Sequence, residues 1–363
     1  MAYSCEPQMP RYNQFVVVGL LLVLLSVIVG IGVSASVPPV SRDALTHHLA
    51  IPKLYLKYGG LVELPEIPFS YYPMNMDLLY LAALATGNDI LPKYVHFLFG
   101  LLTAGLIYRY LRRRIGLLYG MSGALLWLSL PIVVRLSSEV YIDLGLGFFS
   151  MAALCSLIRW SESSKNFPCL IWSGVWTGLA LGTKYNAFLT LTILAAIIPF
   201  IYLRLKPRRT EPRGSRIPDR SSSKIPISPA LRALLSAIVF SVVAAAVFSP
   251  WAARNIILKG NPVYPMFTHI FNADEESPQD EWSRTSTTVQ DTSSTLTVRR
   301  LVFGESFVAI GMLPLRVFFE GRDDDPRYFD GKLNPFLPLL ILAALMPLQT
   351  GGRLAAERWI WFI

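Results

Sequence analysis

The stretch Phe15–Val33, FVVVGLLLVLLSVIVGIGV, decides the fold class. It holds 19 consecutive residues without a charged side chain. An α-helix of about this length crosses the hydrocarbon core of a bilayer. The run is longer than the apolar part of a typical signal peptide and similar runs follow it, so we expect a helix that is retained in the membrane.

Composition extends this interpretation to the whole chain. Of its 363 residues, 53% are hydrophobic and 16% are charged, whereas soluble proteins are usually about a quarter charged. The sequence therefore predicts an all-α protein, a polytopic transmembrane helical bundle forming a single integral membrane domain over residues 1–363. The expected spans, about eight, lie at 15–33, 91–110, 116–134, 140–158, 168–183, 186–203, 233–250 and 333–349.

The distribution of charge predicts the topology. Much of the net charge of +9 lies in loops, which indicates membrane topology and not a nucleic-acid partner. Neither phosphate-binding motif, G-x-x-x-x-G-K-[ST] or G-x-G-x-x-G, occurs. Basic clusters at 109–114 and 204–232 are expected in the cytoplasm with the N-terminus. Both clusters fall on the cytoplasmic side only if the short apolar run 74–86 does not cross the membrane. We therefore expect this run to lie in the outer interface. Segments 34–90 and 251–332 then face the extracytoplasmic side, and the first carries interfacial helices.

Directly after the first span comes Ser41–Gly60, SRDALTHHLAIPKLYLKYGG. Ser41 is a plausible N-cap, which would place Asp43 in the first turn, where the helix dipole favours an ionised carboxylate. His47 lies four residues on and should share its face. Asp43 is thus a candidate base or metal ligand, with His47 beside it as a candidate substrate-binding residue. An amphipathic interfacial helix with solvated polar side chains would show the same pattern.

Two acidic residues open the fourth expected span. Glu139 and Asp143 are four residues apart and should share a helix face. Asp143 is followed by apolar residues, so it should lie at or inside the membrane boundary. A charged side chain at that depth costs free energy, which favours a functional role. The alternative is an interfacial acid that pairs with Arg135.

Cations and aromatic residues occur near the same predicted face. Lys184 interrupts an apolar run, which an anionic partner such as a lipid phosphate would explain. Arg254 follows the seventh span, and arginine suits bidentate phosphate contacts. Tyr185 and Tyr264 accompany these cations as candidate substrate-binding residues. A snorkelling lysine and an ordinary aromatic belt are the alternatives.

The sequence gives little indication of a metal site. The three cysteines do not suggest a zinc site or a disulfide scaffold, and no H-E-x-x-H motif occurs. His96 lies in an apolar span and His269 in a loop, so both are poor ligand candidates. We predict no metal site and no certain cofactor. Binding of a divalent metal ion by the carboxylates is kept as an alternative.

Together these segments resemble the GT-C class of membrane glycosyltransferases. The likeness is greatest to the branch similar to protein O-mannosyltransferases, which also contains the lipid A aminoarabinose transferases. The matching pieces run over nearly the whole chain: the Asp43 segment, Tyr141-Ile-Asp143, Gly182-Thr-Lys-Tyr185, Ser249-Pro-Trp251 with Arg254, and Asn261-Pro-Val-Tyr-Pro265.

The resemblance implies an enzyme that moves a sugar from a polyprenyl-phosphate donor to a protein, lipid or glycan acceptor. Transfer would occur on the extracytoplasmic face of the plasma (inner) membrane, with inversion in a single displacement. Asp43 matches the essential acid of the first loop and is the expected base. Asp143 matches the second acid better than Glu139, and Lys184 and Arg254 match the residues that hold the lipid phosphate.

The chain also departs from this pattern. The segment Ser70–Met74 lacks the lysine that aminoarabinose-type relatives carry there. The last residues, Arg358–Ile363, read as the beginning of another span, which predicts a truncated member of a longer family. A lipid-linked sugar transporter or flippase is one alternative, although no internal repeat is evident. A non-catalytic membrane subunit is the other, and it would not require Asp43 and Asp143 to converge.

Overall fold

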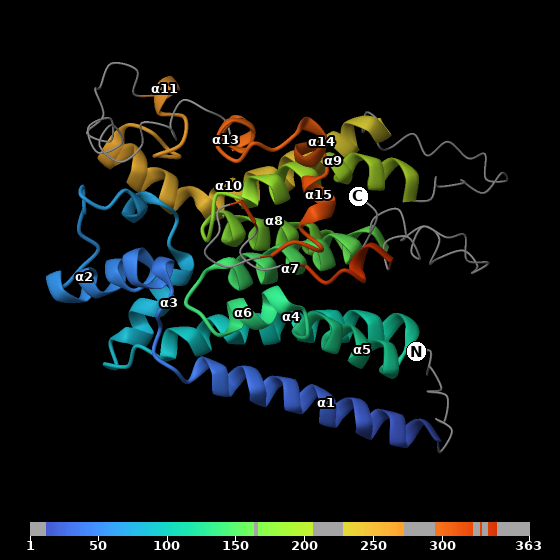
Figure 1. Cartoon of the computed structure of the whole chain (residues 1–363). Helices are drawn as coiled ribbons and strands as arrows, with labels where there is room; N and C mark the ends of the chain where they lie inside the picture. Colours follow the sequence, from blue (N-terminus) through green and yellow to red (C-terminus); the bar gives the residue numbers. More distant parts are fainter. Residues whose placement is uncertain are drawn as a thin grey trace, which may run out of the picture.

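The computed structural model describes residues 12–162, 166–205, 228–271, 295–321, 327–328 and 333–339. Its long helices lie side by side in one bundle (Figure 1). The prediction of an all-α, polytopic helical membrane protein is confirmed.

Within the described residues, four helices are long and apolar enough to cross a membrane: α1 (Tyr12–Ala35), α4 (Leu91–Ile115), α7 (Asp143–Glu162) and α10 (Pro229–Lys259). Helix α1 lies at the edge of the bundle (Figure 1) and leaves most of its apolar side chains exposed. Such a helix is suited to contact with lipid.

The predicted span 116–134 is broken in the structure. It consists of α5 (Leu117–Leu128) and α6 (Pro131–Ser137), which meet at an angle of 67°. Pro131 lacks a backbone N–H and holds the preceding Leu130 in an extended conformation, so one continuous helix cannot form. Counted together, these helices form a fifth possible span.

The next two helices, α8 (Phe167–Leu181) and α9 (Ala187–Leu205), include apolar segments shorter than a full span. Helix α8 packs closely on α10 at Gly178. A Cβ atom at this position would lie only 2.6 Å from a backbone oxygen of α10. Most of the last predicted span, 333–349, lies outside the described residues. The predicted total of eight spans therefore stays a prediction.

The segment between α1 and α4 forms short helices at one end of the bundle, the left end in Figure 1. These are a π-helical turn, η1 (Ala44–His48), followed by α2 (Ala50–Tyr58), a 3₁₀ turn, η2 (Pro68–Tyr71), and α3 (Asn75–Leu84). The run 74–86 thus forms a helix too short to span. Helix α3 packs on α2 and α4, where a single buried cluster joins Tyr80 of α3 to Leu144 of α7, Leu181 of α8 and Phe248 of α10.

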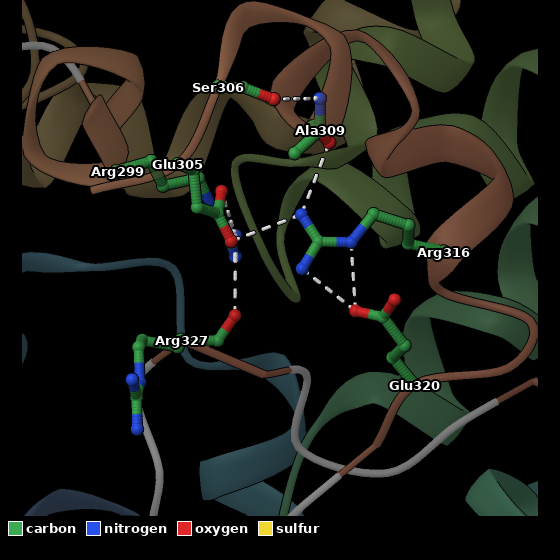
Figure 2. A network of polar contacts seen from close by, with 7 residues as sticks. All are labelled: Arg299, Glu305, Ser306, Ala309, Arg316, Glu320 and Arg327. Carbon is green, nitrogen blue, oxygen red and sulfur yellow. Dashed lines mark hydrogen bonds and ion pairs between the residues drawn. The ribbon is translucent and has the colours of Figure 1, made fainter. Parts of the chain in front are cut away.

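After α10 come the short helices α11 (Thr268–Phe271), α13 (Thr295–Leu301), α14 (Phe307–Gly311) and α15 (Leu313–Arg316). A polar network fastens the last three to one another (Figure 2). Most of the polar part of the predicted loop 251–332, and most of the basic loop 204–232, lie outside the described residues.

Figure 2 shows Glu305 between Arg299 and Arg316 in this network. Its carboxylate accepts hydrogen bonds from Arg299 and Arg316, each at 3.0 Å, and Arg316 also pairs with Glu320 at 2.8 Å. Burial raises the pKa of Glu305, but the hydrogen bonds from the two arginines outweigh it and leave this pKa below the ordinary value. The carboxylate therefore remains charged between its arginine partners at neutral pH.

Candidate active site

A cavity of about 300 Å³ lies where four segments meet at the end of the bundle that carries α2 and α3. They are the turn preceding α2, the segment 69–77 from η2 to the start of α3, the turn between α6 and α7, and the turn between α8 and α9. The polar side chains that line it are Asp43, His47, His48, Tyr72, Asp77, Tyr141, Asp143, Thr183, Lys184, Tyr185 and Asn186.

Asp43 enters this cavity from the π-helical turn. The amide of Leu49 donates to the carbonyl of Ala44, which widens the turn by one residue compared with an α-helix. The predicted cap is wrong, because the Ser41 hydroxyl is buried without a hydrogen-bond partner. Among the described residues, the Asp43 carboxylate has neither a hydrogen bond nor an ion pair, which leaves it available to a substrate.

His47 lies beside Asp43 on the cavity wall. Its Nδ1 atom lies 2.9 Å from the Thr46 hydroxyl, and its ring stacks on Phe69 with the centroids 4.4 Å apart. Burial, and to a lesser extent the neighbouring His48, lowers the pKa of His47 to about 4. The His47 ring is therefore neutral at physiological pH and presents an aromatic surface to the cavity.

A second carboxylate in the cavity belongs to Asp77, which the sequence interpretation missed. Its Oδ1 atom lies 2.8 Å from Nδ1 of His48, and both side chains are only 8% exposed. An ionised carboxylate can only accept, so the imidazole donates from Nδ1. The sequence did indicate this residue, because Asp77 interrupts an apolar run just as Asp143 does.

Lys184 and Asp143 form an ion pair in the same cavity. Their Nζ and Oδ1 atoms lie 2.7 Å apart, and each side chain is one third exposed. The anionic partner expected for Lys184 is thus supplied by the chain itself. An ammonium group has three donors, so two remain for a ligand.

Glu139 does not share a face with Asp143, contrary to the expectation. Helix α7 begins only at Asp143, and Glu139 lies in the preceding turn, outside the cavity lining. One of its carboxylate oxygens is buried without a hydrogen-bond partner in the structure. The spacing of four residues indicates a shared face only when all residues between are helical.

Arg254 and Tyr264 also lie outside the lining. Arg254 donates to the carbonyl of Ser70 at 3.0 Å, which fastens the first-loop segment to α10. The carbonyl of Tyr264 accepts from the hydroxyl of Tyr185 at 3.0 Å. Tyr185 does line the cavity, and Tyr264 supports it from behind.

The turn that carries Lys184 is held by Asn75, another residue that sequence patterns did not indicate. The backbone amide of Asn75 donates to Gly182 at 2.8 Å, and its side-chain amide donates to Leu179 at 3.1 Å. Its Oδ1 atom accepts from the Trp251 indole at 2.9 Å. One asparagine at the start of α3 therefore joins α8 and α10 beside the cavity.

The described residues contain no group of three or more histidine, cysteine, aspartate or glutamate side chains placed to hold a metal ion.

These observations define a helical membrane protein with an acidic cavity at one end of its bundle. Residues 78–218 match the family model described as dolichyl-phosphate-mannose-protein mannosyltransferase. The match includes Asp143 and Lys184 and begins after Asp43. It confirms the predicted family resemblance and supports a membrane glycosyltransferase of the mannosyltransferase type. No curated protein and no solved structure matches the chain.

Proposed function

We propose that this protein transfers a sugar from a polyprenyl-phosphate donor to an acceptor on the extracytoplasmic face of the plasma membrane, with its N-terminus in the cytoplasm. One observation carries the proposal: an unpaired carboxylate, Asp43, and an ion pair, Asp143 with Lys184, line the same cavity although they are distant in sequence. The alternative of a non-catalytic subunit gives no reason for this convergence.

The chemistry needs a base and a stabilised leaving group. An oxygen of the acceptor attacks the anomeric carbon while the bond from that carbon to the phosphate oxygen breaks. The electron pair leaves with the polyprenyl phosphate, and the hydroxyl proton passes to Asp43. One displacement inverts the anomeric centre.

Lys184 stabilises the departing phosphate in this proposal. Asp143 fixes its ammonium group through one donor, and the remaining two donors contact phosphate oxygens. Arg254 lies outside the lining, so its role is to hold the first-loop segment in place, and the predicted phosphate contact falls to Lys184. Tyr185 and the neutral His47 contribute aromatic surfaces on which a sugar ring can pack.

The test is transfer of labelled mannose from dolichyl-phosphate mannose in membranes that contain the full chain. Asp43→Asn should reduce transfer at least a hundredfold, because the amide cannot accept the proton. Asp89→Asn is the matched control, since Asp89 lies in the same loop but pairs with Lys53 at the surface, both about half exposed. Transfer by Asp43→Asn at the native rate would remove Asp43 as the base. Movement of the intact donor across the bilayer without transfer would instead indicate a flippase.

The proposed orientation has its own test. The substitution Asp89→Cys is made in a variant without the native cysteines. The new thiol should react with a membrane-impermeant maleimide added to intact cells. Reaction only after the membrane is permeabilised would place the cavity in the cytoplasm and contradict the proposal.

A further inference from the structure

His96 is a fully buried polar residue, 0% exposed, in α4. It does not line the cavity, and its place in an apolar span makes it look like a packing residue. Among the described residues, however, all of its hydrogen bonds go to residues 136–144, which lead into α7 and carry Asp143.

These hydrogen bonds determine the tautomer of the imidazole. Nδ1 lies 2.8 Å from the carbonyl oxygen of Leu136 and 3.1 Å from that of Glu139, and carbonyl oxygens only accept. Nε2 lies 3.0 Å from the backbone nitrogen of Leu144, which only donates. The ring must therefore carry its proton on Nδ1 and accept through Nε2.

The contact with Leu144 is important because of its position in the helix. Helix α7 begins at Asp143, so the amide of Leu144 belongs to the first turn and has no carbonyl partner within the helix. His96 supplies the missing acceptor. It thereby fixes the first turn of α7, from which the Asp143 side chain reaches Lys184.

A second buried side chain holds the same turn from another direction. Tyr80 of α3, also 0% exposed, donates its hydroxyl hydrogen to the carbonyl of Tyr141. Residues 136–144 are thus held from α3 and from α4. Because the turn contributes Tyr141 and Asp143 to the cavity, small shifts in it move the cavity wall directly.

We propose that His96, as the neutral Nδ1–H tautomer, is a positioning residue that holds Asp143 in place to pair with Lys184. The effect on catalysis rests on the proposed function, whereas the tautomer and the protection of the Leu144 amide do not. Three measurements on the full chain in lipid nanodiscs separate the two.

The first measurement is nitrogen NMR of histidine-labelled protein. The chain has four histidines, and His96→Gln assigns the signal of His96 by its loss. The expected spectrum shows one protonated Nδ1 and one unprotonated Nε2 at neutral pH. An Nε2–H tautomer or an imidazolium would overturn the proposal, whether or not the protein transfers sugar.

The second measurement is amide hydrogen exchange at Leu144. His96→Phe should make it about tenfold faster, because one hydrogen bond to this amide is lost. His96→Gln, whose side-chain amide can donate and accept at a similar spacing, should restore most of the protection. Thr103→Val is the control, since Thr103 is equally buried in α4 but bonds only within its own helix. Equal acceleration in this control would show a general loosening of the bundle and overturn the specific role.

The third measurement is a double-mutant cycle on transfer. His96→Phe should lower kcat at least tenfold and leave the KM of the donor within about threefold. In the Asp143→Asn background it should lower kcat by less than about twofold, because a residue that acts through Asp143 has nothing left to position. An equal loss in both backgrounds would overturn the proposal. If the native chain shows no transfer, the proposed function fails, and the first two measurements still decide the role of His96.

Discussion

Replacing Asp143 by asparagine removes the only anion that contacts Lys184 among the described residues, and leaves the lysine charged in the cavity. At the observed separation of 2.7 Å, Coulomb attraction in an effective dielectric of about 20 amounts to about 6 kcal/mol. Each side chain is one third exposed, so water offsets most of this attraction. In its burial the pair is intermediate between two reference cases. Exposed ion pairs contribute up to about 1 kcal/mol to stability, and disrupting a buried ion pair costs about 3–5 kcal/mol. We therefore expect Asp143→Asn to lower stability by about 1–2 kcal/mol.

The assay is thermal unfolding of the detergent-solubilised full chain, followed by tryptophan fluorescence. In a chain of this length a loss of this size lowers Tm by about 1–3 °C. Lys184→Met in the Asp143→Asn background should recover much of the loss, since it removes the unpaired cation. Transfer should stay at least tenfold below the native rate in both variants, because neither can stabilise the leaving phosphate as the pair does. If Asp143→Asn unfolds at the native Tm, or if the second substitution lowers Tm further, the reasoning about this pair is wrong.

Three further predictions concern packing and charge. Gly178→Leu should cost about 1–3 kcal/mol in thermal unfolding, because any Cβ there approaches a backbone oxygen of α10, whereas Gly147→Ala meets nothing within 4 Å and should be tolerated. His48→Ala should cost about 3–5 kcal/mol, because it leaves Asp77 buried without its partner. The lowered pKa of Glu305 stabilises the native fold at neutral pH, and this contribution is lost as the pH falls below the ordinary value of 4.5. Glu305→Gln should therefore unfold with a weaker pH dependence than the native chain below that value.

Each of these predictions has a defined contrary result. A Gly178→Leu protein as stable as Gly147→Ala would mean that α8 and α10 do not pack at this distance. If replacing both His48 and Asp77 by leucine costs as much as His48→Ala, the unpaired carboxylate is not the source of the loss. Parallel acid-unfolding curves for Glu305→Gln and the native chain would show that the arginines do not hold the carboxylate ionised.

The outcome for individual residues shows how far sequence patterns reach. Asp143 and Lys184 were identified because an ionisable side chain in an apolar run is costly and needs a reason. The same rule applies to Asp77, which was missed because its run is too short to span. Glu139 was placed wrongly, because a spacing of four residues has meaning only inside a continuous helix and the helix begins at Asp143.

The sequence by itself determined that this is a helical membrane protein. Runs such as Phe15–Val33 predict helices, because lipid offers no hydrogen-bond partners and a helix satisfies its backbone groups within the segment. Only the tertiary structure decided which polar groups meet. Lys184 pairs with Asp143 across 41 residues, and His48 pairs with Asp77 across 29. Apolar periodicity describes one segment at a time, whereas these contacts depend on how the ends of separate helices pack, which no single segment encodes.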